Sequence, residues 1–187
     1  MYKRQPFVAG TFQIGLGYLR NDFLVMLIVG VVFFGIFTPV AGLLADRFGR
    51  RPMLLVVTAL IALFGLSFQV WFGGSAGEPV VTTAFLAVGL ALMGLTFGPM
   101  GALLPELFPT NVRYTGSAIA YNVASTLGAS IAPIVALLLW QRDGNILLVG
   151  LYLTGAAIIT FVALLLVKET REVDLLDAAL LEATVAP

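Results

Sequence analysis

Long uncharged stretches alternate with short polar segments along the whole chain. Five stretches lack Asp, Glu, Lys and Arg altogether: residues 23–45, 53–77, 79–105, 114–141 and 144–167. Each is longer than the roughly 20 apolar residues that an α-helix needs to cross the hydrocarbon core of a bilayer. None shows the strict alternation of polar and apolar residues that is typical of membrane β-strands. We therefore predict an all-α membrane protein.

A shorter apolar stretch at residues 5–19 adds a sixth predicted span. Gly10, Gly15 and Gly17 interrupt it, so we expect either a broken helix or one whose first half is missing. Because the connections are short, successive helices should be antiparallel neighbours in one six-helix transmembrane bundle, residues 1–167. The predicted spans are 5–19, 23–45, 53–72, 80–104, 115–140 and 145–167, and residues 168–187 form a cytoplasmic tail.

Basic residues are distributed unevenly between the two sides of this predicted bundle. One side receives Lys3, Arg4, Arg47, Arg50, Arg51, Arg113, Lys168 and Arg171, and the other receives Arg20 and Arg142. Positive charge collects in cytoplasmic loops. Both termini are therefore predicted to be cytoplasmic, and the bilayer is expected to be the plasma (inner) membrane of a bacterial type of cell.

The composition narrows the range of functions. Hydrophobic residues make up 60% of the chain, and ten basic residues balance ten acidic ones. A neutral chain lacks the basic face that a nucleic-acid partner requires. With no Cys and no His, thiol, His-triad, zinc–thiolate and haem sites are excluded, so we expect no enzymatic activity, no metal and no cofactor. Tyr is the only ionisable side chain at mid-span, so a group that titrates during proton coupling must lie elsewhere.

Two polar segments carry the most specific patterns. The first, between the second and third predicted spans, reads Gly42-Leu-Leu-Ala-Asp46-Arg47-Phe-Gly49-Arg50-Arg51-Pro52. Gly49 permits a tight reversal of the chain, and Pro52 suits the first turn of the helix that follows. The second segment has six residues between Glu106 and Arg113 and continues as Tyr-Thr-Gly. A positive-inside anchor explains basic residues, but not this order of Gly, Asp and Arg.

The first segment resembles the cytoplasmic signature of the major facilitator superfamily, and the second resembles that family's loop between helices 10 and 11. The runs Arg113-Tyr-Thr-Gly and Lys168-Glu-Thr-Arg171 are most similar to the metabolite–proton symporter branch, with the sugar-porter branch second. The resemblance covers nearly the whole chain, but only helices 7–12 of the family's twelve. It implies a fragment whose partner is a missing N-terminal half of six helices.

The resemblance implies transport of a small polar metabolite by alternating access, as symport with a proton. The implied cytoplasmic gate consists of Gly42, Asp46, Arg47, Gly49, Arg50, Arg51, Glu106 and Arg113. The implied cavity lining consists of Gln13, Tyr121, Asn122 and Thr126, although packing against a neighbouring helix is the more common use of such polar groups. Two alternatives stay open: a sugar-porter-like facilitator, and a self-contained six-span protein that forms a homodimer.

Small residues recur at helical spacing in two of the predicted spans. One contains the pair Gly94 and Gly98, and the other contains the series Gly116, Ala120, Ala124, Gly128 and Ala132. Small side chains let two membrane helices approach closely. We expect both sets to face a neighbouring helix, either as fixed packing or as a surface along which helices slide.

Overall fold

The computed structural model describes residues 19–72, 78–143 and 146–166, and within these ranges the regular structure is entirely helical. The helices are α2 Arg20–Phe48, α3 Arg50–Leu66, α4 Phe68–Phe72, α5 Pro79–Glu106, α6 Arg113–Asp143 and α7 Ile146–Leu166. Among them, α2, α5, α6 and α7 are long and apolar enough to cross a membrane. The all-α membrane class is confirmed. The predicted tail at 168–187 and, apart from Leu19, the predicted span at 5–19 lie outside the described residues.

Turn residues and charges set the helix boundaries. α5 begins at Pro79, where a missing N–H costs nothing because the first helical N–H groups have no partner within the helix. α2 has Asp22 in its first turn and Arg47 in its last. The negative charge therefore lies at the positive end of the helix dipole and the positive charge at its negative end, and both interactions are favourable. Gly49 lies between α2 and α3 with φ of 100°, a conformation that L side chains rarely adopt.

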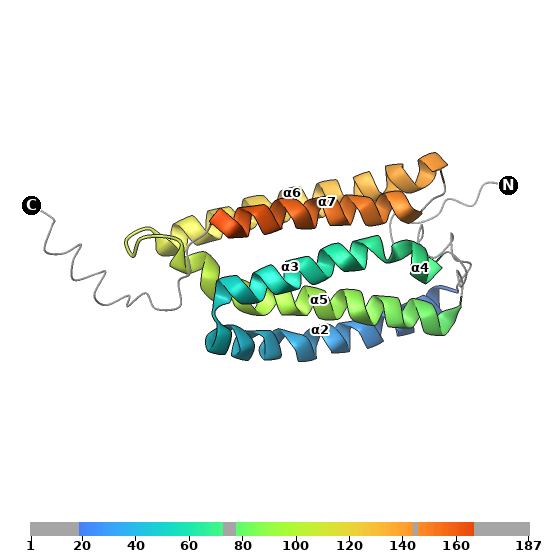
Figure 1. The fold of residues 1–187 in the computed structure, drawn as a ribbon, viewed down its shortest axis with the longest axis horizontal. Coiled ribbons are helices and arrows are strands. Elements are labelled where there is room, and N and C mark those ends of the chain that lie inside the picture. Colours follow the sequence, from blue (N-terminus) through green and yellow to red (C-terminus); the bar gives the residue numbers. More distant parts are fainter. Residues whose placement is uncertain (1–18, 73–77, 144–145, 167–187) are drawn as a thin grey trace, which may run out of the picture.

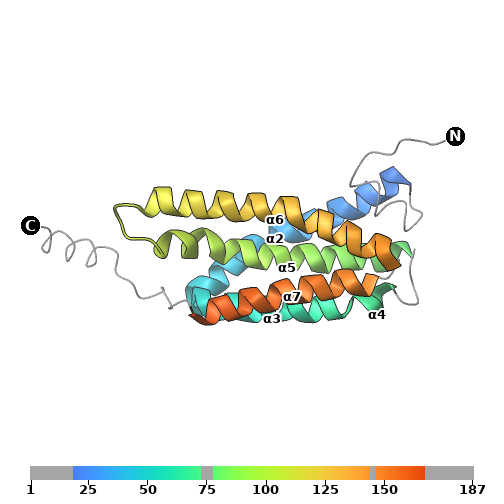
Figure 2. The same ribbon diagram turned by 90° about the horizontal axis from the view of Figure 1, so that it is seen from above.

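The helices pack as two close pairs. Successive helices do touch, but the most extensive contacts join α2 to α5 and α3 to α7, with α5 also contacting α3 and α6. Figures 1 and 2 show the long helices running side by side along the longest axis of the molecule. Chain order alone therefore does not give the principal partners.

Glycines bring α2 and α5 together. A Cβ atom built on Gly94 would lie 2.7 Å from the Phe34 carbonyl oxygen, and one on Gly98 would lie 2.8 Å from the Gly42 nitrogen. On the α2 side, a Cβ atom on Gly30 would lie 3.1 Å from the Leu86 carbonyl oxygen. The two backbones touch at several levels, which only residues without side chains allow.

A second backbone contact joins α3 to α7. A Cβ atom on Gly150 would meet the Gly65 carbonyl oxygen, and Thr154 Oγ1 lies 3.1 Å from the Ala62 carbonyl oxygen across the helix pair. This contact was not predicted from the sequence. Gly150 and Thr154 are four residues apart, which is the small-residue spacing that could have revealed it.

The third predicted span, at 53–72, is divided in the structure at Ser67. The Ser67 hydroxyl donates to the Phe64 carbonyl oxygen at 2.7 Å and accepts from Trp71 Nε1 at 3.0 Å. Serine hydroxyls compete in this way with the regular helical pattern. Beyond the break, α4 buries Phe68 and Phe72 against Phe85 of α5.

The small-residue series on α6 does not form one straight contact. Residues four apart on an α-helix drift by about 40° per step, and so by about 160° from Gly116 to Ala132. Gly116 lies against the Phe108 ring, with 2.5 Å from a built Cβ to Phe108 Cδ1, whereas a Cβ on Gly128 meets no described atom within 4 Å. Residues 121–131, Ala124 among them, are exposed throughout, and Ala120 and Ala132 are half-buried.

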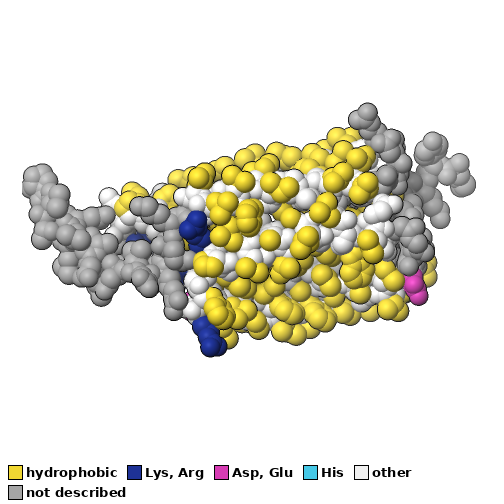
Figure 3. Space-filling model, viewed as in Figure 1, with side chains coloured by type: hydrophobic (Ala, Val, Ile, Leu, Met, Phe, Trp, Pro, Cys, Tyr) yellow, Lys and Arg dark blue, Asp and Glu magenta, His cyan; other side chains and the backbone are white. Residues whose placement is uncertain are grey.

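Charged side chains lie at the ends of the bundle. Figure 3 shows a broad apolar band with arginine side chains at one end and acidic side-chain atoms at the other, and the carboxylates of Asp46 and Glu106 lie beside Arg50 at the arginine end. The exposed apolar residues include Val25, Ile28, Val56, Leu63 and Ile159. A continuous apolar surface between the two charged ends is typical of a protein that is surrounded by lipid.

Candidate functional site

The corner between α2 and α3 positions the basic residues of the first motif. The Gly49 N–H donates to the Ala45 carbonyl oxygen at 2.9 Å, which ends α2, and the chain then reverses through the positive φ of Gly49. Arg50 and Arg51 therefore fall in the first turn of α3, next to the ends of α5 and α7. Gly42, one helical turn before Asp46, faces Gly98 of α5 through its backbone nitrogen.

Arg50 forms the central ion pair. Its Nη2 lies 3.0 Å from Glu106 Oε1 and 3.9 Å from Asp46 Oδ1. The Arg50 and Glu106 side chains are only 18% and 14% exposed, whereas Asp46 is 71% exposed. Because water screens an exposed pair strongly, Glu106 is the partner that determines the energy of this site. The pair joins the start of α3 to the end of α5.

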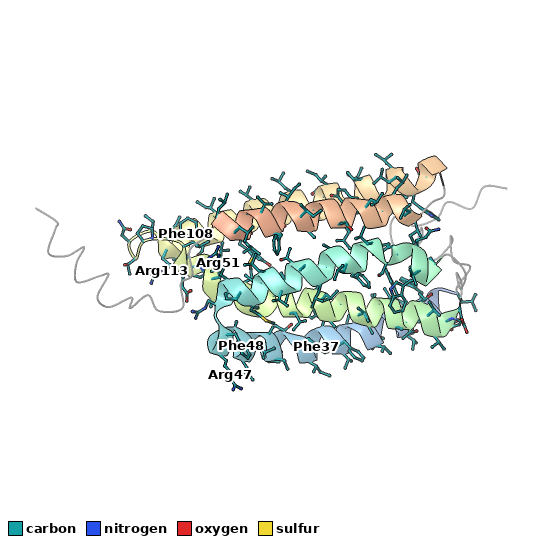
Figure 4. All side chains as sticks on the ribbon, viewed as in Figure 1. Phe37, Arg47, Phe48, Arg51, Phe108 and Arg113 are labelled. Atoms are coloured by element: carbon teal, nitrogen blue, oxygen red, sulfur yellow. The ribbon has the colours of Figure 1, made fainter. Side chains whose placement is uncertain are left out.

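Arg51 points to another helix. Its Nε donates to the Leu164 carbonyl oxygen at 3.0 Å, and its Nη2 donates to the Leu165 carbonyl oxygen at 2.7 Å. Figure 4 shows its side chain at the end of the bundle where α3 and α7 meet. The two adjacent arginines of the motif thus bind different neighbours.

The remaining basic residues of the implied gate lie further out. Arg47 is exposed, with its guanidinium carbon 5.6 Å from the centre of the Phe48 ring. Arg113 begins α6, and its Nε is 3.4 Å from the Phe108 carbonyl oxygen, across the turn that joins α5 to α6. Figure 4 shows both arginines at the same end of the molecule as Arg51.

The polar residues of α6 share one side of that helix. At about 100° per residue, Tyr121, Asn122, Ser125 and Thr126 fall within an arc of about 140°. The opposite side carries bulky apolar residues, all about half exposed: Val123, Leu127, Ile131, Ile134 and Leu138. Asn122 Nδ2 donates to the Ala118 carbonyl oxygen at 2.8 Å, and this bond occupies one of its two N–H donors. Gln13, the fourth predicted cavity residue, lies outside the described residues.

No cluster of three or more His, Cys, Asp or Glu side chains that could hold a metal ion occurs in the described ranges. The ionised side chains there lie at the helix ends, and mid-span positions carry only hydroxyl and amide groups.

In the described ranges, a bundle of long apolar helices that is ionised only at the helix ends, with an arginine–glutamate pair joining two helices at one end, has the architecture of an integral membrane protein. Comparison with known sequences gives the family. The chain matches the sugar (and other) transporter family over residues 11–180. It belongs to that family, which confirms the resemblance to the major facilitator superfamily.

Relatives with curated names are membrane transporters. The chain is 54% identical to the inner membrane metabolite transport protein YhjE of Escherichia coli K12, over 90% of this chain and 38% of that protein. It is 46% identical to a putative metabolite transport protein of Haemophilus influenzae, over 89% and 37%. It is 32% identical to the proline/betaine transporter of E. coli K12, over 82% and 30%. The chain thus spans less than two fifths of each of these relatives, and no solved structure matches it.

Proposed function

We propose that this chain is the C-terminal six-helix half of a transporter that moves a small polar metabolite across an inner membrane by alternating access. The observation that carries the proposal is the pair between Arg50 and Glu106, in which two mostly buried charges meet at 3.0 Å at one end of the bundle. Membership of a transporter family supports the same function. The whole protein would pair this bundle with a second one, outside the present sequence.

The Arg50–Glu106 pair has suitable energetics for a gate. A hydrogen bond to a charged group contributes roughly 1.5–3 kcal/mol, which is enough to bias an equilibrium between two conformations and small enough to break in each cycle. Asp46 is exposed on the same end of the bundle. We propose that Asp46, Arg47 and Arg113 complete the gate by contacts with the other half.

The polar side of α6 is the proposed cavity wall. The Ser125 hydroxyl donates within the helix, to the Asn122 carbonyl oxygen at 3.2 Å, but the Asn122 amide has a second N–H and a side-chain oxygen for which hydrocarbon offers no partner. The bulky apolar side of the same helix suits lipid or another helix. Tyr121, Asn122 and Thr126 would therefore face a solvated path between the two halves, together with Gln13.

Proton coupling is the finer part of the proposal. The described spans carry no carboxylate at mid-membrane depth, so the group that exchanges the proton would belong to the other half. Uptake by proteoliposomes that contain the full-length protein tests both parts. A symporter should accumulate a labelled substrate such as proline or betaine when a proton gradient is directed into the vesicles. This accumulation should stop when an uncoupler collapses the gradient. Equilibration without accumulation would favour the facilitator alternative.

Substitution of Asn122 tests the cavity wall. We expect Asn122→Ala to lower uptake several-fold by raising the apparent KM, because the substrate loses a hydrogen bond worth about 1 kcal/mol. Val123→Ala, one residue along on the apolar side, is the matched control and should leave uptake unchanged. Equal uptake in both variants and in the parent would contradict the proposal that α6 lines the substrate cavity.

Topology provides an independent test. We propose that both termini are cytoplasmic, since eight basic residues lie on one side and two on the other. A reporter that is active only in the cytoplasm should be active when fused after Pro187 and silent when inserted at residues 73–77. The reverse pattern would overturn the orientation and place the Arg50–Glu106 pair at the outer end.

A further inference from the structure

The adjacent arginines of α3 perform separate tasks. Arg50 reaches Glu106 on α5, whereas Arg51 binds two backbone carbonyl groups of α7. We propose that Arg51 is a positioning residue that fixes the end of α7 to the start of α3, so that these two helices move as one unit while the Arg50–Glu106 pair opens and closes. The joint movement of α3 and α7 rests on the proposed function, but the attachment of α7 by Arg51 does not.

The antiparallel arrangement of α3 and α7 gives this attachment an electrostatic basis. The start of α3 is the positive end of its dipole, where two arginines are unfavourably placed unless they find negative partners. Arg50 finds carboxylates, and Arg51 finds the carbonyl groups of Leu164 and Leu165. A guanidinium presents its N–H donors in a rigid fork, so one side chain can bind two successive carbonyl oxygens.

A second attachment lies further along the same pair of helices. Thr154 Oγ1 lies 3.1 Å from the Ala62 carbonyl oxygen of α3 and 3.0 Å from the Gly150 carbonyl oxygen of its own helix, so its one O–H is shared between them, and the backbones of Gly65 and Gly150 are in direct contact beside it. At about 1.5 Å per residue, this contact is roughly 17–21 Å from Arg51 along α3. One attachment would leave a pivot, whereas two separated attachments fix the relative orientation of the helices. Arg51 supplies the attachment nearest the gate.

Distances between spin labels in the full-length protein test the proposal. The chain contains no Cys, and cysteines elsewhere in the protein are first replaced by Ser. One label pair, on Cys at Val56 and Val162, reports on the end held by Arg51, because both side chains are more than half exposed. A second pair, at Leu63 and Leu151, reports on the end held by Thr154.

In Arg51→Gln we expect the distance between labels at Val56 and Val162 to lengthen and its distribution to broaden. The distance between labels at Leu63 and Leu151 should stay unchanged. Arg51→Lys keeps the charge but lacks the forked donor group, so it should show the same change in distance to a smaller extent. It replaces Arg51→Gln in the measurement if the Gln variant is not inserted into the membrane. Unchanged distances at Val56 and Val162 in the inserted variant would overturn the proposal.

Arg50→Gln is the matched control, one residue away. It should leave both distances unchanged and lower uptake. An equal shift in Arg50→Gln and Arg51→Gln would mean that the two arginines act together, which contradicts the proposal. Normal uptake in Arg50→Gln would contradict the gate role of the Arg50–Glu106 pair but not the attachment of α7 by Arg51. Failure of the proposed function and failure of the attachment are therefore distinguishable.

Discussion

Replacing Arg50 by Gln in the full-length protein is expected to lower uptake roughly tenfold to hundredfold, because a charge-assisted hydrogen bond contributes about 1.5–3 kcal/mol and each 1.4 kcal/mol is tenfold. The variant leaves Glu106 mostly buried without its 3.0 Å partner. The cost falls on the conformation that contains the pair. Initial uptake rates, normalised to the amount of protein in the membrane, measure the effect.

Two further variants separate this pair from its neighbours. Exchanging the charges, with Arg50→Glu and Glu106→Arg together, should recover part of the uptake that either single exchange removes. Asp46→Asn should weaken the Arg50–Glu106 pair less than loss of either partner does, since Asp46 is 3.9 Å from Arg50 and 71% exposed. A charge exchange with no recovery, at normal expression, would show that the contact between these two residues is not what uptake requires.

Gly150→Ala is expected to destabilise the bundle by about 1–3 kcal/mol, the usual cost of overpacking. A Cβ atom at Gly150 meets the backbone oxygen of Gly65 and lies 3.0 Å from Phe68 Cβ. Backbone atoms cannot move aside as a flexible side chain can. Thermal unfolding of the purified protein in detergent should show a lower midpoint.

Gly155→Ala on the same helix is the matched control. No described atom lies within 4 Å of a Cβ built there, and Ala is favoured over Gly inside a helix by about 0.5–1 kcal/mol. This variant should therefore unfold at the same temperature as the parent or slightly above it. If both variants behaved alike, the contact between α3 and α7 would be looser than the structure indicates.

The positions of the helices followed from the distribution of charge. Uncharged stretches at 23–45 and 114–141 became α2 and α6, each continuing a few residues into polar sequence. A helix satisfies its own backbone groups, so it need not end where lipid ends. The break at Ser67 was not foreseen, because it depends on a hydrogen bond with Trp71 and on aromatic packing around Phe85.

The motif residues could be found from the sequence, but their partners could not. Arg50 and Arg51 are identical in type and adjacent, and only the placement of α5 and α7 separates an ion pair from a bond to backbone carbonyls. Spacing by four approximates a helical turn, and this is why the sequence predicts that the whole series of small residues on α6 faces one neighbouring helix. The accumulated drift turns Gly128 away from the side on which Gly116 meets Phe108.

The break at Ser67 also affects the lipid around the protein. α3 has 17 residues, which span about 25 Å at 1.5 Å each, less than the roughly 30 Å of hydrocarbon in an ordinary bilayer. The helix then changes direction, and the half-buried indole of Trp71 follows on α4, a residue type that prefers the depth of lipid headgroups. With Ser67 and the five residues of α4, residues 50–72 span about 34 Å, against about 42 Å for the 28-residue α5, so the bilayer beside α3 and α4 is expected to be locally thinner than beside α5. Hydrophobic mismatch on this one flank makes the bundle sensitive to the acyl-chain length of its surrounding lipids.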